Sequence, residues 1–296
     1  MNEDVLESYE RSVVHEVQQW LNREPGWTGQ LLGGVSDRSR QALDLMLTTE
    51  WGRRTLRKAT ERAVGALEGV ALRGLADQRE ASVVPGDSQN RQAMLRRADE
   101  RAGQLRNLYV GLLGVQGGLV GAASLTWTRS AAAIVADVAI AVAVTLRAAA
   151  HHLAVYRVAP SRPSVLEAAV EVVAVATETD AAMRQHHIAG LSRGLLENLR
   201  DDELDRELSR VVIQQTSSRA VKEAVEQTVR RVLRGRLAGL VPVLGAATGG
   251  ATSAWLAAQV CEAARQVGRV TFLARHTPLH VSELLAIHAE AAAAPS

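Results

Sequence analysis

The sequence predicts an all-α protein, built as a compact bundle of many helices. Apolar residues recur at helical spacing along nearly the whole chain, and no convincing alternation of apolar and polar residues indicates a strand. Aromatic residues make up only 3% of the 296 residues, so Ala, Val and Leu must fill the core. Small aliphatic side chains favour closely packed helices over a β-sandwich.

Residues 1–78 form the predicted N-terminal helical region. A first helix is expected over 3–23, and the sequence EPGW ends it because Pro and Gly disfavour a helix interior. Ser36 or Asp37 can cap a second helix, with one break near Gly52.

Residues 79–90, REASVVPGDSQN, mix Pro, Gly, Asp, Ser and Asn, which indicates a loop or linker. A basic helix follows over 91–106 and leads into a glycine-rich, uncharged run over 107–128. An Ala/Val-rich helix is then expected over 130–156.

Two prolines end that segment, and Ser164 and Glu167 have the spacing of a capping box at the start of the next helix. Residues 276–296 should form a C-terminal helix and a frayed tail. Further helices are predicted over 180–199, 201–215, 217–236, 242–274 and 280–293.

Two runs without charge, 107–128 and 237–261, are each long enough to cross a hydrocarbon core of ~30 Å as a helix. Both are rich in Gly, Ala, Ser and Thr, and they contain Gln116 and Pro242. Asp137 interrupts the third apolar segment, and a lipid-facing carboxylate is costly. We therefore expect these helices to be buried in a water-soluble body rather than to span a membrane.

The glycines of GLLGVQGGLVGAASLTW, residues 111–127, match neither a phosphate-binding loop, which needs a Lys, nor the G-x-G-x-x-G fingerprint. Gly114 and Gly118, like Gly117 and Gly121, lie one helical turn apart and remove side-chain bulk from one stripe. The pattern predicts a helix that packs tightly against 237–261 or 130–156. Leucine at Gly118 or Gly249 should therefore overpack the core.

This glycine segment, a long helix ending in AVY, and the later stretch GLVPVLGAATGGATSAWLAAQVCEAARQVGRVTFL together resemble the EcsC family. The resemblance covers residues 91–275, as an EcsC-like helical core. Arg157 stands where the family has a Gly after the aromatic residue, and Ser253 replaces a late Asn. The resemblance implies a helical, often membrane-associated protein with no established reaction. The helix-packing or ligand-lining candidates are Gly114, Gly117, Gly118, Gly121, Asp137, Pro242, Gly245 and Gly249.

Asp137 is the most unusual charge in the chain, because it lies between AAAIVA and VAIAVAV. If buried, it is a candidate for binding a cation or a proton. The alternatives are that it faces solvent or pairs with an Arg of another helix. We favour the ion pair, since an unpaired buried carboxylate is costly.

No metal or cofactor is expected. His276 and His280 at i, i+4 would share a helix face and bind Zn²⁺ with Glu283, but Pro278 lies between them and breaks the helical register. Cys261 has no His partner at a fixed spacing and is predicted to be a small core residue rather than a nucleophile. We therefore predict no catalytic residue.

Basic residues cluster beside the apolar segments. Each can contribute ~1 kcal/mol at an anionic membrane surface. The alternative is solvated helix faces, since Asp and Glu are interleaved, and no recognition motif supports nucleic acid as the partner. The membrane-surface candidates are Arg53, Arg54, Arg57, Arg96, Arg97, Arg230, Arg231 and Arg234.

The single Cys and the acidic N-terminus without an apolar signal core indicate the cytoplasm. We expect a non-enzymatic protein, peripheral to the inner face of a membrane, that acts as scaffold or regulator of a membrane system. Its partners would be anionic lipid and a membrane protein. The alternative is a carrier that holds an acyl chain or another apolar, lipid-like ligand in its helical core.

Overall fold

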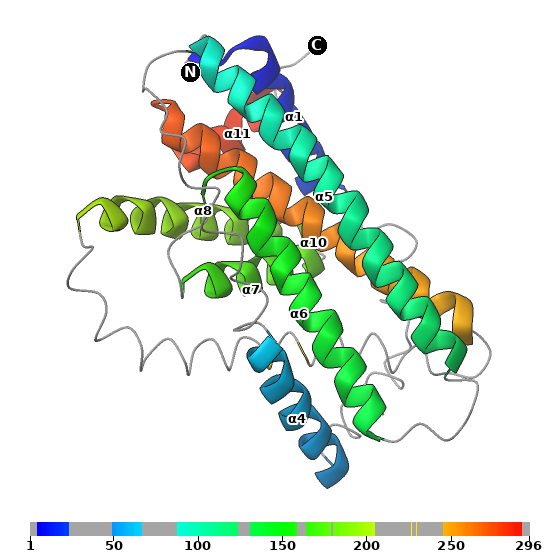
Figure 1. Cartoon of the computed structure of the whole chain (residues 1–296). Helices are drawn as coiled ribbons and strands as arrows, with labels where there is room; N and C mark the ends of the chain where they lie inside the picture. Colours follow the sequence, from blue (N-terminus) through cyan, green and yellow to red (C-terminus); the bar gives the residue numbers. More distant parts are fainter. Residues whose placement is uncertain are drawn as a thin grey trace.

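The computed structural model describes residues 5–23, 49–66, 88–123, 131–158, 164–178, 180–204, 226, 229 and 245–291. The surroundings of some helical side chains, among them residues 117–123, 131–137 and 245–252, fall outside this description. Within it the chain forms eight helices and no strand, so the all-α prediction is confirmed. The helices are α1 (Ser8–Leu21), α4 (Glu50–Ala66), α5 (Ser88–Ala123), α6 (Ala131–Val155), α7 (Ser164–Thr177), α8 (Ala181–Leu204), α10 (Gly245–His276) and α11 (Val281–Ala291) (Figure 1).

Helix α10 is the centre of the bundle. It lies alongside α5 over much of the length of both helices, and it also contacts α6, α7, α8, α1 and α11 (Figure 1). Helix α4 packs on α6, away from α1 and α11. The fold therefore joins the two glycine-rich helices, α5 and α10, as its main contact, one of the two arrangements that their small-residue stripes predict.

Several predicted boundaries differ from the structure. Helix α1 begins at Ser8 rather than residue 3, because the Glu10 carboxylate accepts the backbone N–H of Glu7 at 3.0 Å and caps the helix there. Helix α4 begins at Glu50 and continues through Gly52. The predicted boundary between residues 199 and 201 is wrong, since α8 continues to Leu204 through a sequence without Pro or Gly.

Other boundaries agree with the prediction. The basic segment and the glycine segment form one continuous helix, α5. Helix α7 begins at Ser164, and α10 ends at His276 before α11 starts at Val281. The turn at Pro25 and Gly26 and the caps at Ser36 or Asp37 lie outside the described residues.

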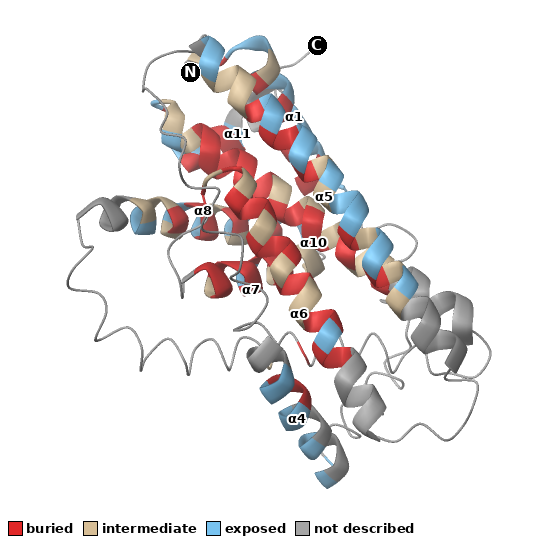
Figure 2. Cartoon of the chain, viewed as in Figure 1, coloured by how far each residue is buried: buried red, intermediate tan, exposed pale blue. Residues whose placement is uncertain are grey.

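Many of the buried residues lie in α6, α7 and α10 (Figure 2). The core consists mainly of Ala, Val and Leu, as the composition predicts. Three successive alanines of α6, residues 148–150, are fully buried, which is possible because small side chains let helices approach from several sides. Val138–Val155 of α6 is the one stretch among the described helices that is long and apolar enough to cross a membrane. Since 67% of that stretch is buried, its apolar character is explained by the core.

Helix α6 ends in a Schellman motif. The N–H of Arg157 bonds to the carbonyl of Ala154 at 2.9 Å, and the N–H of Val158 bonds to that of Leu153 at 3.1 Å. This motif requires a left-handed residue, and Arg157 has φ 57°. Glycine, which the resemblance leads one to expect at this position, would adopt this conformation without steric cost.

Replacing Arg157 by Gly is expected to raise the free energy of unfolding by about 1 kcal/mol, because the left-handed backbone no longer strains a Cβ atom. Arg157→Ala is the control, since it removes the same side chain but keeps the Cβ. Urea titration followed by circular dichroism measures both variants. Equal stability of the two variants would show that backbone strain at this position is negligible.

Candidate functional site

A buried carboxylate, Asp99 of α5, joins four segments of the chain. Its Oδ1 accepts hydrogen bonds from the Tyr156 hydroxyl, from Arg269 Nε at 2.8 Å and from Arg265 Nε at 3.4 Å. Its Oδ2 accepts one from the Tyr9 hydroxyl at 2.6 Å. These partners come from α1, the end of α6, and α10, so a single side chain connects elements that are far apart in sequence.

Arg269 is the most deeply buried cation of this group, with 1% of its surface exposed. Its Nη1 bonds to Glu16 Oε2 at 2.7 Å, and Gln266 Oε1 lies 3.5 Å away. Asp99 therefore faces the guanidinium groups of Arg269 and Arg265, and Glu16 faces that of Arg269. We call Asp99, Arg269, Arg265, Glu16, Tyr9 and Tyr156 the Asp99 network.

The electrostatics of the Asp99 network keep the carboxylate charged. Burial alone raises the pKa of Asp99, but the hydrogen bond and charge of Arg269, with the hydrogen bonds from Tyr156 and Tyr9, lower it overall. Burial and the adjacent Asp99 raise the pKa of both tyrosines, so their hydroxyls remain protonated donors. Because Asp99 and Arg269 are buried and already paired, this arrangement is suited to holding helices together rather than to reacting with a substrate.

A second buried ion pair closes the same end of the bundle. Arg91, near the start of α5, contacts Glu10 of α1 at 2.5 and 2.9 Å and donates to the carbonyl of His276, the last residue of α10, at 3.2 Å. Glu10 is fully buried. The N-terminal helix is therefore attached to α5 and α10 by two separate charge clusters.

His152 is a buried histidine between α6 and α5. Its Nδ1 lies 2.8 Å from the carbonyl oxygen of Ala148, and its Nε2 lies 3.2 Å from that of Ala102. Burial lowers the pKa of His152 to about 4, although the two carbonyls act in the opposite direction. The ring is thus neutral at pH 7 and protonates readily only after unfolding.

Stability is expected to fall as the pH decreases from about 6.5, the ordinary pKa of histidine, towards 4, because the unfolded chain then binds a proton that folded His152 does not. The loss attributable to this residue should reach about 2–3 kcal/mol at pH 4.5. His276 contributes in the same direction, since burial lowers its pKa to about 4. In urea titrations from pH 7 to 4.5, His152→Gln should be less pH-dependent than the wild type. Parallel curves would contradict the assignment.

The outward face of α5 was not predicted as a separate feature. Much of one side of α5 is exposed (Figure 2). The buried side includes Tyr109 and Leu113, whereas three large apolar side chains on the opposite side are exposed. Leu108 is 61% exposed, Leu112 51% and Val115 65%, and their spacing places them on one helix face. We call these three residues the α5 ridge.

Gly114 is the one residue of the predicted glycine stripe whose surroundings the structure describes. A Cβ atom on Gly114 would lie 3.5 Å from the Cβ of Ala254 of α10, which is ordinary van der Waals contact, so the close packing expected of the stripe stays a prediction. Gly117, Gly118 and Gly121 lie in α5 and Gly245 and Gly249 in α10, but the surroundings of these glycines fall outside the described residues, as does Pro242 altogether.

Among the glycines described, the one with the least space is Gly268, which the sequence did not indicate. A Cβ atom on Gly268 of α10 would lie only 2.4 Å from Cδ2 of Tyr156. A lone glycine in a helix gives little sequence signal. The buried tyrosine therefore belongs both to the Asp99 network and to the tightest packing contact among the glycines described.

The predicted basic residues lie on exposed helix surfaces where the structure describes them. Arg53, Arg54 and Arg57 are exposed on α4, with Arg54 paired to Glu50 and Arg57 Nε 4.0 Å from Glu61. On α5, Arg96 and Arg97 are exposed, and the Arg96 guanidinium lies 4.8 Å from the centre of the Tyr9 ring. Arg230, Arg231 and Arg234 lie outside the described residues.

The other candidate groups have structural explanations. His276 ends α10 and His280 precedes α11, so the predicted break of register is confirmed. No group of three His, Cys, Asp or Glu side chains within the described part of the chain is placed to hold a metal. Cys261 is buried, and burial raises its pKa to about 12, as expected of a core residue. Asp137 lies in α6, but its side-chain surroundings are not described.

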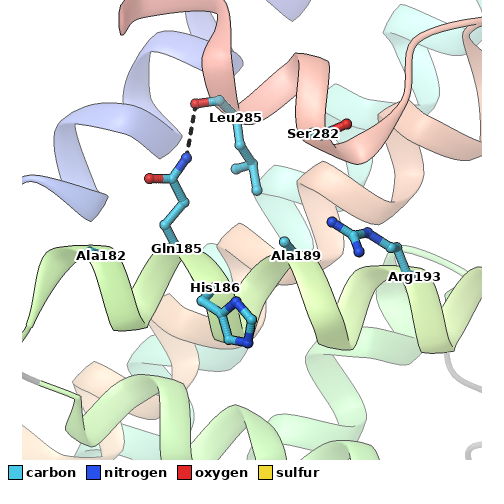
Figure 3. Close-up of a pocket in the computed structure, with 7 residues that line it drawn as sticks. All are labelled: Ala182, Gln185, His186, Ala189, Arg193, Ser282 and Leu285. Carbon is cyan, nitrogen blue, oxygen red and sulfur yellow. Dashed lines mark hydrogen bonds between the residues drawn. The ribbon is translucent and has the colours of Figure 1, made fainter.

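A pocket of about 290 Å³ lies between α8 and α11 (Figure 3). Gln185 crosses it and donates to the carbonyl of Leu285 at 3.4 Å. Its walls combine small, polar and charged side chains, which do not form the apolar chamber that an acyl chain would need. The lining residues are Ala182, Gln185, His186, Ala189, Arg193, Ser282 and Leu285.

The described helices define an all-α protein whose buried charges hold its helices together. The chain belongs to the EcsC protein family, whose model matches residues 11–273. This match extends further towards the N-terminus than the resemblance over 91–275. It includes α1 from residue 11 onward, and with it Glu16, which contacts Arg269. No curated protein and no solved structure matches the chain.

Proposed function

We propose that this EcsC protein is a non-enzymatic, cytoplasmic protein that attaches to the inner face of a membrane and acts there as a scaffold or regulator. The observation that carries the proposal is the cationic row on the outward face of α5. Arg97 and Arg101 are both exposed, lie one turn apart, and make no ion pair within the described part of the chain.

Anionic lipid is the partner that best fits such a row. An arginine near an anionic leaflet contributes ~1 kcal/mol, so the two residues together account for about 2 kcal/mol before any other contact. The exposed arginines of α4 are a weaker candidate, because Arg54 and Arg57 already face glutamates. The interaction should weaken as salt shortens the Debye length from ~10 Å at 0.1 M to ~3 Å at 1 M.

The non-enzymatic part of the proposal is supported by the Asp99 network. Its two central charges, Asp99 and Arg269, are buried and paired with each other, and burial keeps Cys261 as a thiol. Burial and their contact with each other explain the pKa shifts of Asp99 and Arg269 without a substrate.

Flotation with lipid vesicles tests the proposal. The untagged protein should float with vesicles containing anionic lipid at 0.1 M salt, remain unbound at 1 M salt, and ignore neutral vesicles. Arg97→Glu/Arg101→Glu should lower the partition coefficient about 30-fold or more. Arg11→Glu/Arg193→Glu, which has the same net charge and changes exposed residues on α1 and α8, is the matched control and should bind nearly as the wild type does.

Equal loss in both double variants would mean that net charge, not the α5 row, determines binding. Absence of flotation, together with lipid that co-purifies at a fixed stoichiometry, would contradict surface attachment and favour the acyl-chain carrier.

A further inference from the structure

We infer that the α5 ridge is a membrane-insertion surface, and that α5 docks at a tilt with the C-terminal half of its outward face in the lipid. This inference rests on the proposed attachment to anionic lipid and specifies how the protein is oriented on the bilayer. Three large aliphatic side chains in one row, each more than half exposed, are not explained by the packing of the described helices.

The ridge and the cationic row lie on the same line of the helix. At 100° per residue, Arg97, Arg101, Leu108, Leu112 and Val115 fall within an arc of about 60° on the outward face. Glu100 is also exposed, but it lies about 60° from Arg97 around the axis, to one side of this line.

Along this line, the charged side chains come before the apolar ones, just as charged headgroups lie outside the apolar acyl region of a bilayer. With a rise of 1.5 Å per residue, Arg101 lies about 10 Å from Leu108 along the axis, and the ridge itself extends about 10 Å. Cations at one end match anionic headgroups, and aliphatic side chains at the other match the acyl region. The sequence contains no charge between Arg106 and Arg129, so the ridge end of the helix carries none into the lipid.

A second copy of the chain fits this surface less well. Parallel pairing of two α5 faces would bring Arg97 and Arg101 against their own copies, and antiparallel pairing would place these arginines over the apolar ridge. A bilayer offers anionic headgroups to the arginines and acyl chains to the α5 ridge at the same time.

The insertion must be shallow. The opposite side of α5 is packed on α10, where Gly114 approaches Ala254, and Tyr109 and Leu113 are buried. The helix therefore stays in the bundle while its outward side chains enter the boundary between headgroups and acyl chains, to the ~5–10 Å depth usual for interfacial helices.

Spin-label depth measurements on anionic vesicles test the inference. Nitroxides attached at Gln104→Cys, Leu108→Cys, Leu112→Cys and Val115→Cys should show increasing protection from a water-soluble nickel complex and increasing collision with oxygen in that order. Met183→Cys, an exposed apolar position on α8, should remain accessible to water. The native thiol, Cys261, is fully buried and should not react with the spin label. Wild-type protein treated with the same label is the control for any labelling at Cys261.

A second variant tests binding itself. Leu108→Gln/Leu112→Gln should lower the partition coefficient about tenfold or more without changing stability, whereas Met183→Gln should leave it unchanged. Salt-sensitive flotation with all labels in water would overturn the insertion but leave the electrostatic attachment intact. Protection of the ridge without lipid, or a stable dimer by light scattering, would overturn it in favour of a protein interface. Failure of the wild type to float would overturn both proposals.

Discussion

Replacing Asp99 by Asn is expected to destabilise the protein by roughly 3–5 kcal/mol, the range for breaking a buried ion pair by removing one partner. The variant leaves the guanidinium of Arg269, which is 1% exposed, without the carboxylate that its Nε contacts at 2.8 Å. It also replaces the two carboxylate oxygens that accept the hydroxyls of Tyr9 and Tyr156 by a neutral amide, which has only one acceptor oxygen. Urea unfolding at pH 7, followed by circular dichroism, measures the loss.

Glu16→Gln is the matched control, because it also removes a carboxylate that contacts Arg269, but one whose side chain is 50% exposed. Its effect should not exceed about 1 kcal/mol. If Asp99→Asn were no more destabilising than Glu16→Gln, the Asp99 network would not be a major source of stability.

The wild type and Asp99→Asn should also differ in how their stability depends on pH. The pKa of Asp99 is lowered in the folded state, so its contribution to stability is present above its ordinary pKa of about 4 and is lost as the pH falls through the lower folded value. Asp99→Asn lacks this group, so its stability should decline less steeply than that of the wild type below pH 4.

Replacing Gly268 by Ala is expected to cost about 3 kcal/mol. The new Cβ would lie 2.4 Å from Cδ2 and 2.8 Å from Cγ of Tyr156, and the ring is fully buried with its hydroxyl bound to Asp99. Relief of the clash must therefore displace either the tyrosine from the Asp99 network or α10 from α6. Thermal and urea unfolding measure the effect.

Gly190→Ala in α8 is the control, because nothing lies within 4 Å of the position that its Cβ would occupy. That substitution should stabilise the helix by about 0.5–1 kcal/mol, since alanine has the higher helix propensity. Similar stability of the two alanine variants would show that the contact between Gly268 and Tyr156 is easily relieved.

The fold class and several helix ends could be predicted because they depend on local chemistry. Helical periodicity predicted the all-α fold, Pro278 predicted the break between α10 and α11, and the small-residue stripes predicted contact between α5 and α10. The family motif also identified Arg157 as a departure from glycine, although only the backbone shows that this residue is left-handed.

The buried clusters could not be predicted because their partners are distant in sequence. Asp99 and Arg269 are 170 positions apart, and nothing in the spacing of either indicates the other. One signal was available: Asp99 shares a helix face with Leu95 and Ala102, an apolar face on which a carboxylate is unexpected.

The α5 ridge was missed for a different reason. The uncharged run 107–128 was interpreted as a buried helix, and for Tyr109 and Leu113 this is right. Where apolar residues occur on all sides of a helix, periodicity cannot tell which side packs against the bundle. The expectation of a buried helix is therefore wrong for the side of α5 that carries Leu108 and Val115.

Fractionation of the cells that produce this protein is the most direct test of surface attachment through the outward face of α5. The untagged wild type should sediment with membranes, be released by 1 M salt or an alkaline wash, and become soluble when Arg97 and Arg101 are replaced by Glu. A protein that only detergent extracts, or one that remains entirely soluble before any wash, would contradict surface attachment.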